Sequence, residues 1–404
     1  MSVVQNLHVT PAHQTKFRVR PLTLINLVLL AFLAHSLSAQ AREPQSIDLA
    51  TQLEPFRAEG KIPGMVALVI QGDRIVAQGA VGVRKLGSPG LITLDDQFHL
   101  GSCTKAMTAT LAAMLVEEGK LNWNSTLGEL FGDDLKNMQP AWKKVTLQQV
   151  LAHRSGLPDN LPLNRDPPVL AGKSLRQQRE TVVAIALSHQ PETKPGEKEV
   201  YSNLGYIVIG AVLEKITNRS WEELIEERLF KPLGITTGGF GAPGAPGKLD
   251  QPWGHDDQGV PIDPGDPLAD NPKFFGPCGT VHMTVTDWAK FITLHLRGDP
   301  ANPNAQAALL KPETFARLHQ AAPGRSYNAG WAFQTRNFDR GDAWRVFSHN
   351  GSNGLWYCIV LAAPETDFAV LVASNQGMDR AAKPCGDALN ALAREFIPKH
   401  SVIK

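Results

Sequence analysis

Ser102 and Lys105 stand three residues apart in the stretch Gly101-Ser102-Cys103-Thr104-Lys105, at the start of a predicted helix. This spacing, close to one helical turn, puts both side chains on one face, so the amine can reach the hydroxyl. A serine hydroxyl is a weak nucleophile until a base takes its proton, and free N–H groups at a helix N-terminus favour an oxyanion. The pair predicts a nucleophile with its base, although a capping serine beside a solvated lysine has the same pattern.

A second candidate group, Tyr201-Ser202-Asn203, also directly precedes a predicted helix. A phenol near a lysine loses its proton more easily and can pass that proton to a leaving group. The Asn203 side chain offers both a donor and an acceptor to a substrate amide. We therefore expect Tyr201 to transfer protons and Asn203 to bind substrate.

The third candidate group is His349-Asn350-Gly351-Ser352, followed by strand-like sequence. Glycine lets a substrate backbone come close to the edge of a strand. A backbone N–H at this point can complete an oxyanion hole with that of Ser102. His349, Gly351 and Ser352 are therefore predicted to contact substrate.

The three groups occur in this order, each at the boundary of an element, and in that combination the chain resembles the serine β-lactamase and penicillin-binding protein superfamily. The Tyr-x-Asn group resembles the branch that holds class C β-lactamases, DD-peptidases, D-aminopeptidases and related carboxylesterases. The resemblance extends from Asp48 to Pro398. Further stretches that carry it are Val145–Leu147, Leu151–Leu157, Pro232–Ile235 and Gly330-Trp331.

The resemblance implies a role for each of the candidate residues. Ser102 would be the nucleophile, and Lys105 and Tyr201 would transfer its proton. The backbone amides of Ser102 and Ser352 would form the oxyanion hole, and Asn203 would contact the substrate.

His349 is a departure from the class C pattern. In the class C β-lactamases that this chain resembles, the third group is Lys-Thr-Gly. This chain has His349-Asn350-Gly351 there. Histidine is largely neutral at pH 7 and holds a substrate carboxylate less firmly than lysine does. A histidine here, which would still contact substrate, resembles the peptidase and esterase members more than the drug-resistance enzymes.

These features together predict a serine hydrolase without a cofactor or a metal, acting through an acyl-serine intermediate on small esters or D-amino-acid-containing peptides. A class C-like β-lactamase is the alternative with the same chemistry. A non-catalytic binding or assembly protein on the same fold is the alternative of another class, because a fold does not prove an activity. Specificity is expected to lie in loops such as 161–175 and 240–265.

The four cysteines, Cys103, Cys278, Cys358 and Cys385, fit no zinc or redox spacing. An exported protein could oxidise them, but the sequence does not give a pairing. Cys103 adjoins Ser102, yet nothing nearby in the sequence obviously activates it, so we do not expect a thiol nucleophile.

Three further signals are interpreted as structural. The stretch 239–244 matches a dinucleotide-binding fingerprint by letter, but it follows no clear strand. His255-Asp256-Asp257 lacks a second ligand group with metal-binding spacing and is interpreted as a loop. His153 is interpreted as a histidine in a turn.

The elements that must position the candidate residues are strands at both ends of the chain and helices between them. Strands are predicted over 65–70, 74–81, 355–362 and 368–373, and the first two read as a hairpin. Helices are predicted over 48–60, 105–118, 204–216, 286–296 and 381–396, although Pro384 and Gly386 weaken the start of the last. A single sheet is the simplest way to pair the terminal strands.

The expected fold is therefore α/β (α+β) and β-lactamase/transpeptidase-like, with an antiparallel sheet flanked by helices and an inserted, mainly helical domain. We expect residues about 42–100 and 305–404 to form the sheet subdomain and about 101–304 the helical one. Together they make up the hydrolase domain, 42–404.

Composition and the N-terminus limit the partners and the location. The 404 residues carry a net charge of +1, which gives no field for a polyanion, so nucleic acid is not an expected partner. Lys16, Arg18 and Arg20 precede an apolar run, 22–34, and the small residues of Ala39-Gln40-Ala41. This pattern predicts a signal peptide, 1–41, and export to the periplasm or the medium.

An uncleaved anchor is the alternative to a cleaved signal. No other segment is apolar enough to span a bilayer, so no membrane contact is expected beyond residues 1–41. The expected partner is a small-molecule ester, peptide or β-lactam substrate. The sequence does not indicate an oligomeric state.

Overall fold

Strands from the two ends of the chain pair into one main sheet. The computed structural model describes residues 46–163, 165, 167–338 and 343–398. The predicted signal peptide, 1–41, lies outside the described residues, and its cleavage stays a prediction. None of the helices in the described ranges is both long enough and apolar enough to cross a bilayer.

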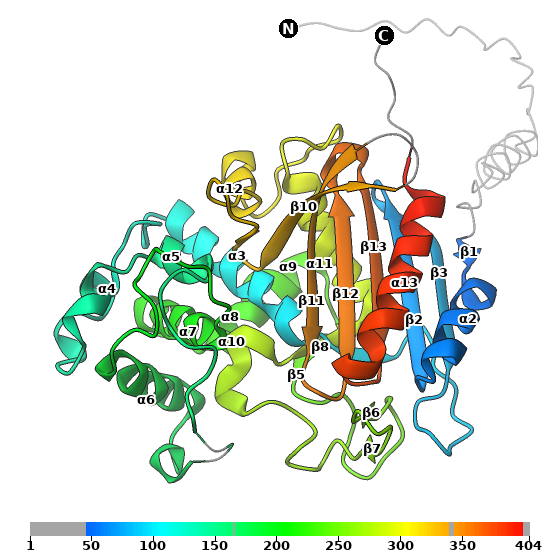
Figure 1. The fold of residues 1–404 in the computed structure, drawn as a ribbon, viewed down its shortest axis with the longest axis horizontal. Coiled ribbons are helices and arrows are strands. Elements are labelled where there is room, and N and C mark those ends of the chain that lie inside the picture. Colours follow the sequence, from blue (N-terminus) through cyan, green and yellow to red (C-terminus); the bar gives the residue numbers. More distant parts are fainter. Residues whose placement is uncertain (1–45, 164, 166, 339–342, 399–404) are drawn as a thin grey trace, which may run out of the picture. The chain divides into compact units, whose positions relative to one another are not determined.

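The main sheet has eight strands in the order β1-β3-β2-β13-β12-β11-β10-β9 (Figure 1). Neighbouring strands are antiparallel except β1, which runs parallel to β3. The predicted antiparallel sheet and its N-terminal hairpin are confirmed. The strands are β1 (Ile47–Asp48), β2 (Gly64–Gln71), β3 (Arg74–Gly82), β9 (Tyr327–Asn328), β10 (Trp331–Asn337), β11 (Ala343–Ser352), β12 (Tyr357–Ala363) and β13 (Phe368–Ser374).

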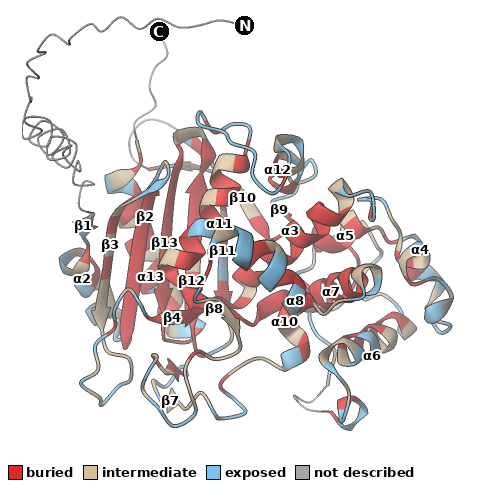
Figure 2. Cartoon of the chain, turned by 180° about the vertical axis from the view of Figure 1, so that it is seen from behind, coloured by how far each residue is buried: buried red, intermediate tan, exposed pale blue. Residues whose placement is uncertain are grey.

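Helices cover both faces of this sheet, which explains why its central strands are apolar without alternation. On β2, Met65, Ala67 and Val69 belong to the core beneath α2 (Ala50–Gly60) and α13 (Met378–Phe396). The residues between them belong to the core on the other face, where α11 (Val285–Gly298) packs. Figure 2 shows the strands as a buried layer between the helices. Burying one such side chain stabilises the fold by about 1.5–3 kcal/mol.

Helix α13 begins earlier than predicted and runs through Pro384 without ending. A proline inside a helix costs about 3 kcal/mol because it removes a hydrogen bond. Here the helix buries a continuous apolar face, including Ala388 and Leu392, against the sheet. Gly60 of α2 lies against the Pro384 ring, where a Cβ would come within 2.7 Å. Packing therefore outweighs the local propensity that the sequence displayed.

The middle of the chain folds mainly into helices, and the predicted helices at 105–118, 204–216 and 286–296 are confirmed. Besides α11 they are α3 (Thr104–Glu117), α4 (Leu127–Phe131), α5 (Leu147–Leu151), α6 (Leu175–Ser188), α7 (Asn203–Thr217), α8 (Trp221–Ile225), α9 (Lys231–Leu233), α10 (Gly276–Gly279) and α12 (Pro312–Leu318). Because α11 packs on β2 and β13, part of the 101–304 stretch covers the sheet. The division into a sheet subdomain and a helical subdomain stays an interpretation.

Shorter elements link these helices. Two small sheets are formed by β4 (Gln97–His99), β8 (Val281–Thr284) and β5 (Gly239–Phe240), and by β6 (Gly254–His255) and β7 (Pro261–Ile262). The short turns, of which η5 is a π-helix and the others are 3₁₀, are η1 (Gly101–Cys103), η2 (Gly132–Asp134), η3 (Pro140–Lys144), η4 (Pro168–Leu170), η5 (Glu226–Phe230), η6 (Lys273–Phe275) and η7 (Pro364–Thr366).

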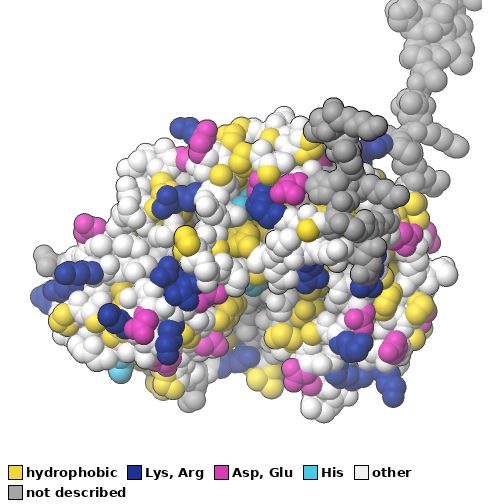
Figure 3. All heavy atoms as spheres, turned by 45° about the horizontal axis from the view of Figure 1, so that its top comes forward, with side chains coloured by type: hydrophobic (Ala, Val, Ile, Leu, Met, Phe, Trp, Pro, Cys, Tyr) yellow, Lys and Arg dark blue, Asp and Glu magenta, His cyan; other side chains and the backbone are white. Residues whose placement is uncertain are grey.

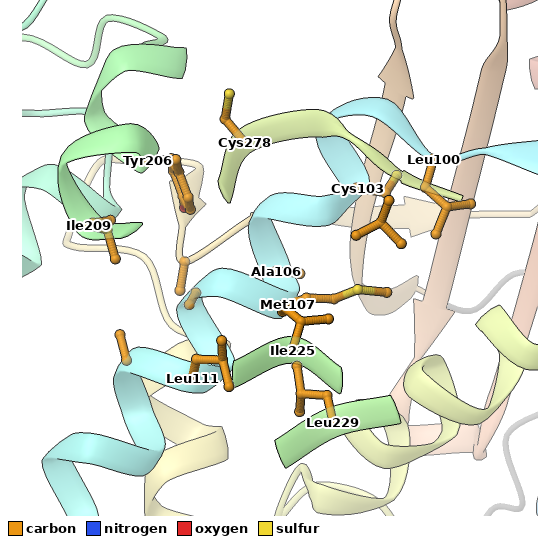
Figure 4. Close-up of a cluster of buried hydrophobic side chains, with 14 of the residues drawn as sticks. Leu100, Cys103, Ala106, Met107, Leu111, Tyr206, Ile209, Ile225, Leu229 and Cys278 are labelled. Atoms are coloured by element: carbon orange, nitrogen blue, oxygen red, sulfur yellow. The ribbon is translucent and has the colours of Figure 1, made fainter. Parts of the chain in front are cut away.

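Helix α3 is the central helix of the fold, and almost every residue of it is buried. It packs against α7, α8 and α10, and η1 at its N-terminal end contacts β11 and β12. Figure 4 shows side chains of α7, α8 and η5 gathered around it. A helix that is apolar on every side is a core helix, so a polar residue on it, such as Lys105, must find partners inside the protein.

The molecular surface shows no face dominated by one sign of charge in the view of Figure 3, where Lys and Arg side chains lie among Asp and Glu. One cluster of charges lies in the interior. The guanidinium of Arg179 is buried and bonded to the carboxylates of Glu214 and Glu222. A buried cation is tolerated when it is paired in this way.

His255 fixes the small β6–β7 sheet to the main sheet and is fully buried. Its Nδ1 lies 2.8 Å from the carbonyl oxygen of Asn375, and its Nε2 accepts a hydrogen bond from the Leu86 N–H over 3.1 Å. This arrangement suits a neutral ring, because a proton on Nε2 would face an N–H donor. Burial lowers the pKa of His255 from 6.5 to about 4.

This histidine makes the stability of the fold depend on pH. The unfolded chain takes up the proton below pH 6.5, whereas the folded chain resists it down to about 4. The contribution of His255 is therefore full above pH 6.5 and falls as the pH drops toward 4. Between pH 7 and pH 5 we expect the free energy of unfolding to lose about 2 kcal/mol through this group.

Urea unfolding at pH 7 and at pH 5 measures this loss. The variant His255→Gln takes up no proton in this range, so its stability should fall by about 2 kcal/mol less than that of the parent protein. Equal falls in the two proteins would show that His255 is not held neutral.

Candidate active site

The turn η1 presents Ser102 at the junction of three elements. Strand β4 delivers the chain to His99, and the N–H of Leu100 bonds to the Val281 carbonyl of β8. Gly101 has a φ of +48°, a conformation that side chains other than glycine rarely adopt. The chain then enters α3, so Ser102 stands at the start of the helix as the sequence predicted.

The end of β11 lies directly against this turn. A Cβ on Gly351 would come within 2.0 Å of the Leu100 carbonyl oxygen and 2.7 Å of the Ser102 nitrogen. A Cβ on Gly101 would come within 2.3 Å of the Ser352 nitrogen. Gly351 therefore allows the nucleophile turn to pack on the strand, which is a different reason for glycine from the close substrate approach that we expected. The third group forms the end of β11, and β12 follows it as the sequence predicted.

The Lys105 side chain is fully buried and has three oxygen partners. Its Nζ lies 3.0 Å from Ser102 Oγ, 2.6 Å from Asn203 Oδ1 and 2.9 Å from the Cys278 carbonyl oxygen. The last two oxygens can only accept, so they hold two N–H bonds of the amine. The third contact of Nζ is with the Ser102 hydroxyl, and this places the amine where a general base must lie.

Tyr201 approaches the same hydroxyl from the other side. Its Oη lies 2.7 Å from Ser102 Oγ, and its ring centroid lies 4.9 Å from Lys105 Nζ. The next residue, Ser202, caps α7 by accepting a bond from the Gly205 N–H. The cap fixes where α7 begins and therefore fixes the position of Tyr201.

His153 supports Tyr201 from behind. Its ring centroid lies 4.4 Å from that of Tyr201, and its Nδ1 accepts a bond from the Ser202 N–H over 3.1 Å. Burial, with the nearby charges of Lys105 and His349, keeps the pKa of His153 well below 6.5. The ring is buried and neutral, in agreement with its interpretation as a structural histidine.

Asn203 lies at the first position of α7 and has both ends of its amide engaged. Its Oδ1 accepts from Lys105, and its Nδ2 donates to Asp159 Oδ1 over 2.9 Å. The Asn203 backbone N–H reaches the same carboxylate oxygen over 3.3 Å. Asp159 therefore fixes which end of the amide faces the lysine. No sequence pattern indicated Asp159, because its spacing to the other groups has no recognisable form.

His349 is 8% exposed, and both nitrogens of its ring have protein partners. Its Nε2 lies 3.1 Å from the Tyr327 hydroxyl, and its Nδ1 lies 2.5 Å from the Asn350 carbonyl oxygen. A substrate contact by His349 would therefore have to replace one of these bonds. That contact stays a prediction.

Ser352 uses its side chain in the turn after β11. The hydroxyl donates to the Trp356 carbonyl and accepts from the Gly354 N–H. Its backbone nitrogen lies on the segment that packs against Gly101, and the binding of substrate by its N–H stays a prediction.

Two features near Ser102 were missed from the sequence. His99 accepts a bond from the Gly101 N–H over 3.0 Å, and its Nε2 lies 2.7 Å from Asp270 Oδ1. Cys103 lies beside the thiol of Cys358 and interacts with His349, so the expectation that nothing activates it needs correction. Both features depend on residues more than 150 positions apart, which a motif cannot display.

A cavity of about 690 Å³ lies between the two loops that we expected to set specificity. Residues 167–172 form one wall, and 240–242 and 264–274 form the other. Asn271 in this wall donates to the Gly279 carbonyl, next to the Cys278 carbonyl that holds Lys105. The wall of the cavity is therefore linked to the catalytic group through α10. Among the described residues, no cluster of three or more His, Cys, Asp or Glu side chains could hold a metal ion.

Comparison with protein families gives one match over most of the chain. A family model described as Beta-lactamase matches residues 49–393. Among curated proteins, Protein flp of Staphylococcus aureus (strain NCTC 8325 / PS 47) is 24% identical over 340 residues, covering 82% of this chain. The match spans only 63% of the length of that relative. Penicillin-binding protein 4 of Amycolatopsis lactamdurans is 25% identical over 336 residues, covering 81% of this chain and 84% of that protein.

Solved structures share the fold. A D-stereospecific amidohydrolase from Streptomyces sp. superposes with a TM-score of 0.65 at 22% identity, over 86% of this chain and 97% of that chain. A β-lactamase/transpeptidase-like fold, expected from the sequence, is thus confirmed.

Asp159 provides a test of how the site is held together. The variant Asp159→Ala leaves the Asn203 amide free to rotate away from Lys105. Hydrogen bonds to charged groups contribute about 1.5–3 kcal/mol, so acylation of the protein by an activated ester should slow by roughly 10–100-fold. Single-turnover acylation measures the rate, and circular dichroism checks folding.

The matched variant Asp159→Asn keeps an oxygen that can accept from Asn203, so it should retain more of the rate than Asp159→Ala. If the alanine variant acylated as fast as the parent protein, Asp159 would have no part in orienting Asn203.

Proposed function

The chain belongs to the beta-lactamase family, and from this membership and the geometry of the site we propose that it is a serine hydrolase that forms an acyl-enzyme on Ser102. The proposal is carried by one observation. Lys105 Nζ and Tyr201 Oη lie 3.0 Å and 2.7 Å from the same oxygen, Ser102 Oγ. A nucleophile within reach of two proton-transfer groups is the arrangement that covalent catalysis requires.

Acylation begins when Ser102 Oγ attacks the carbonyl carbon of the substrate. The hydroxyl proton moves to the Lys105–Tyr201 pair, and negative charge develops on the carbonyl oxygen. The backbone N–H groups of Ser102 and Ser352 are proposed to bind that oxygen, because they lie on the two segments that pack together at Gly101 and Gly351.

Collapse of the intermediate expels the leaving group and leaves an ester on Ser102. Tyr201 is placed to give the proton to the leaving group, because it is 40% exposed and faces the solvent side of the site. Water then attacks the ester, with the same pair acting as the base, and free Ser102 is restored.

The proposed substrates are small esters or D-amino-acid-containing peptides. A D-stereospecific amidohydrolase and a penicillin-binding protein are among the proteins that this chain is similar to. His349 at the third group supports this choice. The class C β-lactamases that this chain resembles have a lysine at this position, and a lysine would hold a substrate carboxylate more firmly than a histidine does. The cavity beside α10 is proposed to receive the acyl side chain.

Two alternatives remain distinct from this proposal. A class C-like β-lactamase would use the same acyl-serine chemistry on a β-lactam. A non-catalytic binding protein would not need Lys105 buried against Ser102 Oγ, and the convergence of two proton-transfer groups on one oxygen argues against it. We further propose that the chain is exported through residues 1–41 and acts in the periplasm or the medium.

The catalytic unit is tested by removing its members. Ser102→Ala and Lys105→Ala should each slow acylation by several orders of magnitude, and the double variant should be little worse than either, because residues that act as a unit give non-additive losses. Tyr201→Phe removes only the hydroxyl and should slow acylation by about 10²–10⁴-fold. Single-turnover acylation with an activated ester gives these rates.

Cys103→Ala is the matched control next to the nucleophile and should keep most of the activity. Activity in Ser102→Ala together with its loss in Cys103→Ala would make the thiol the nucleophile and overturn the proposal.

The role of His349 is tested by charge. His349→Lys should raise the hydrolysis of carboxylate-bearing β-lactams relative to neutral esters, by roughly tenfold at most, because a Coulomb gain at a partly solvated site amounts to about 1 kcal/mol. Hydrolysis rates on a panel of esters, D-peptides and a chromogenic cephalosporin measure the ratio.

Tyr327→Phe is the control, since it frees His349 Nε2 without adding a charge and should leave the ratio unchanged. Parallel changes for both substrate classes in His349→Lys would mean that position 349 does not face the carboxylate.

A further inference from the structure

Two thiols lie in contact directly beneath the proposed nucleophile. The Sγ atoms of Cys103 and Cys358 are 3.6 Å apart, and the Cys358 thiol also lies 3.1 Å from the Leu100 carbonyl oxygen. Cys103 belongs to η1, and Cys358 belongs to β12, opposite Gly351 of β11. Figure 4 shows the Cys103 side chain beside Leu100 on the side of α3 that faces the strands, away from Cys278.

The surroundings distinguish Cys103 from the other three cysteines. Burial raises the pKa of Cys103, but hydrogen bonds with Cys358 and His349 and the charge of Lys105 outweigh it and hold the pKa below its usual value. Burial raises the pKa of Cys278 to about 12 and also raises those of Cys358 and Cys385. Thiolates are the form that oxidants attack, so one partner of the pair is prepared for oxidation and the other is placed to resolve it.

Access to the pair is narrow but present at Cys103. Cys103 is 3% exposed, and its neighbour Ser102 is partly exposed at the mouth of the site. Cys358 is fully buried. A protein oxidant cannot reach these sulfurs in the folded state, whereas hydrogen peroxide, which is close to water in size, can enter where water enters.

We propose that Cys103 and Cys358 form a peroxide-driven disulfide that switches off the serine site. The Cys103 thiolate attacks one oxygen of hydrogen peroxide, giving a sulfenic acid and releasing hydroxide. The Cys358 thiol then attacks the sulfenic sulfur, and the hydroxyl group leaves as water. In total, two thiols and one hydrogen peroxide give one disulfide and two waters. The peroxide is reduced by two electrons, and the sulfurs are oxidised by two.

The crosslink would displace Ser102 because the turn has no room to adjust. The sulfurs must close from 3.6 Å to the disulfide distance of about 2.05 Å. The turn is already packed against β11 so tightly that a single Cβ at Gly351 would overlap it. The movement would therefore shift Ser102 relative to Lys105 and Tyr201, and a displacement of about 1 Å can cost a hundredfold in rate. This consequence for activity rests on the proposed function, whereas the crosslink itself does not.

The experiment treats the purified reduced protein with hydrogen peroxide. After removal of peroxide, non-reducing peptide mapping by mass spectrometry identifies the crosslinked peptides, and single-turnover acylation with an activated ester gives the rate. We expect a Cys103–Cys358 peptide, a loss of acylation rate on the order of a hundredfold, and recovery of the rate with dithiothreitol. Cys103→Ala and Cys358→Ala should keep their rates under the same treatment, which excludes damage at methionine.

Three results would overturn the inference: peroxide leaves both thiols free, Cys103 ends as a sulfinic acid without a crosslink, or the crosslink forms with no change in a measurable rate. A Cys103–Cys358 crosslink, together with a loss of the acylation rate that dithiothreitol reverses, would support it. If the reduced protein never becomes acylated, the proposed function fails, and the peptide map alone still decides whether the two sulfurs join.

Discussion

The close contact between η1 and the end of β11 is the constraint on which the site depends. It joins the start of α3 to the main sheet without any side chain between the two backbones, since a Cβ at Gly351 would lie 2.0 Å from the Leu100 carbonyl oxygen. Gly330 makes a similar close contact one turn along α3, where a Cβ on it would lie 2.4 Å from the Ala106 nitrogen. Overpacking at such positions costs about 1–3 kcal/mol in ordinary cores. Here it would also move the serine away from the strand whose N–H group is proposed to share its oxyanion.

Lys105 is the second consequence of this packing. A lysine on a helix that is buried on every side loses its water, and the loss costs several kcal/mol unless partners replace it. The partners come from separate elements: Asn203 begins α7, and Cys278 belongs to α10. Burial and partners together restrict the amine to one position, 3.0 Å from Ser102 Oγ. The same contacts that make the lysine tolerable in the core therefore aim it at the hydroxyl.

Local patterns were enough to predict the fold class, the hairpin at 65–81 and the three candidate groups, because each depends on neighbours in the chain. The limits of α13 were missed because packing against α2 and the sheet outweighs the local cost of Pro384. Asp159, His99 and the Cys103–Cys358 contact were missed for a related reason. Each of these features depends on a contact between residues at least 44 positions apart in the chain. The spacing of residues in a sequence motif does not show such contacts.

The pair His99–Asp270 joins the wall of the cavity to the turn that carries Ser102. Asp270 lies in the wall of the cavity, and it bonds to His99 Nε2. The other nitrogen of the same ring accepts the N–H of Gly101, the residue before Ser102. Because an imidazole ring is rigid, the position of the Asp270 carboxylate and the position of the Gly101 N–H are tied to each other. The wall of the cavity and the turn that carries Ser102 are therefore joined through one buried ring.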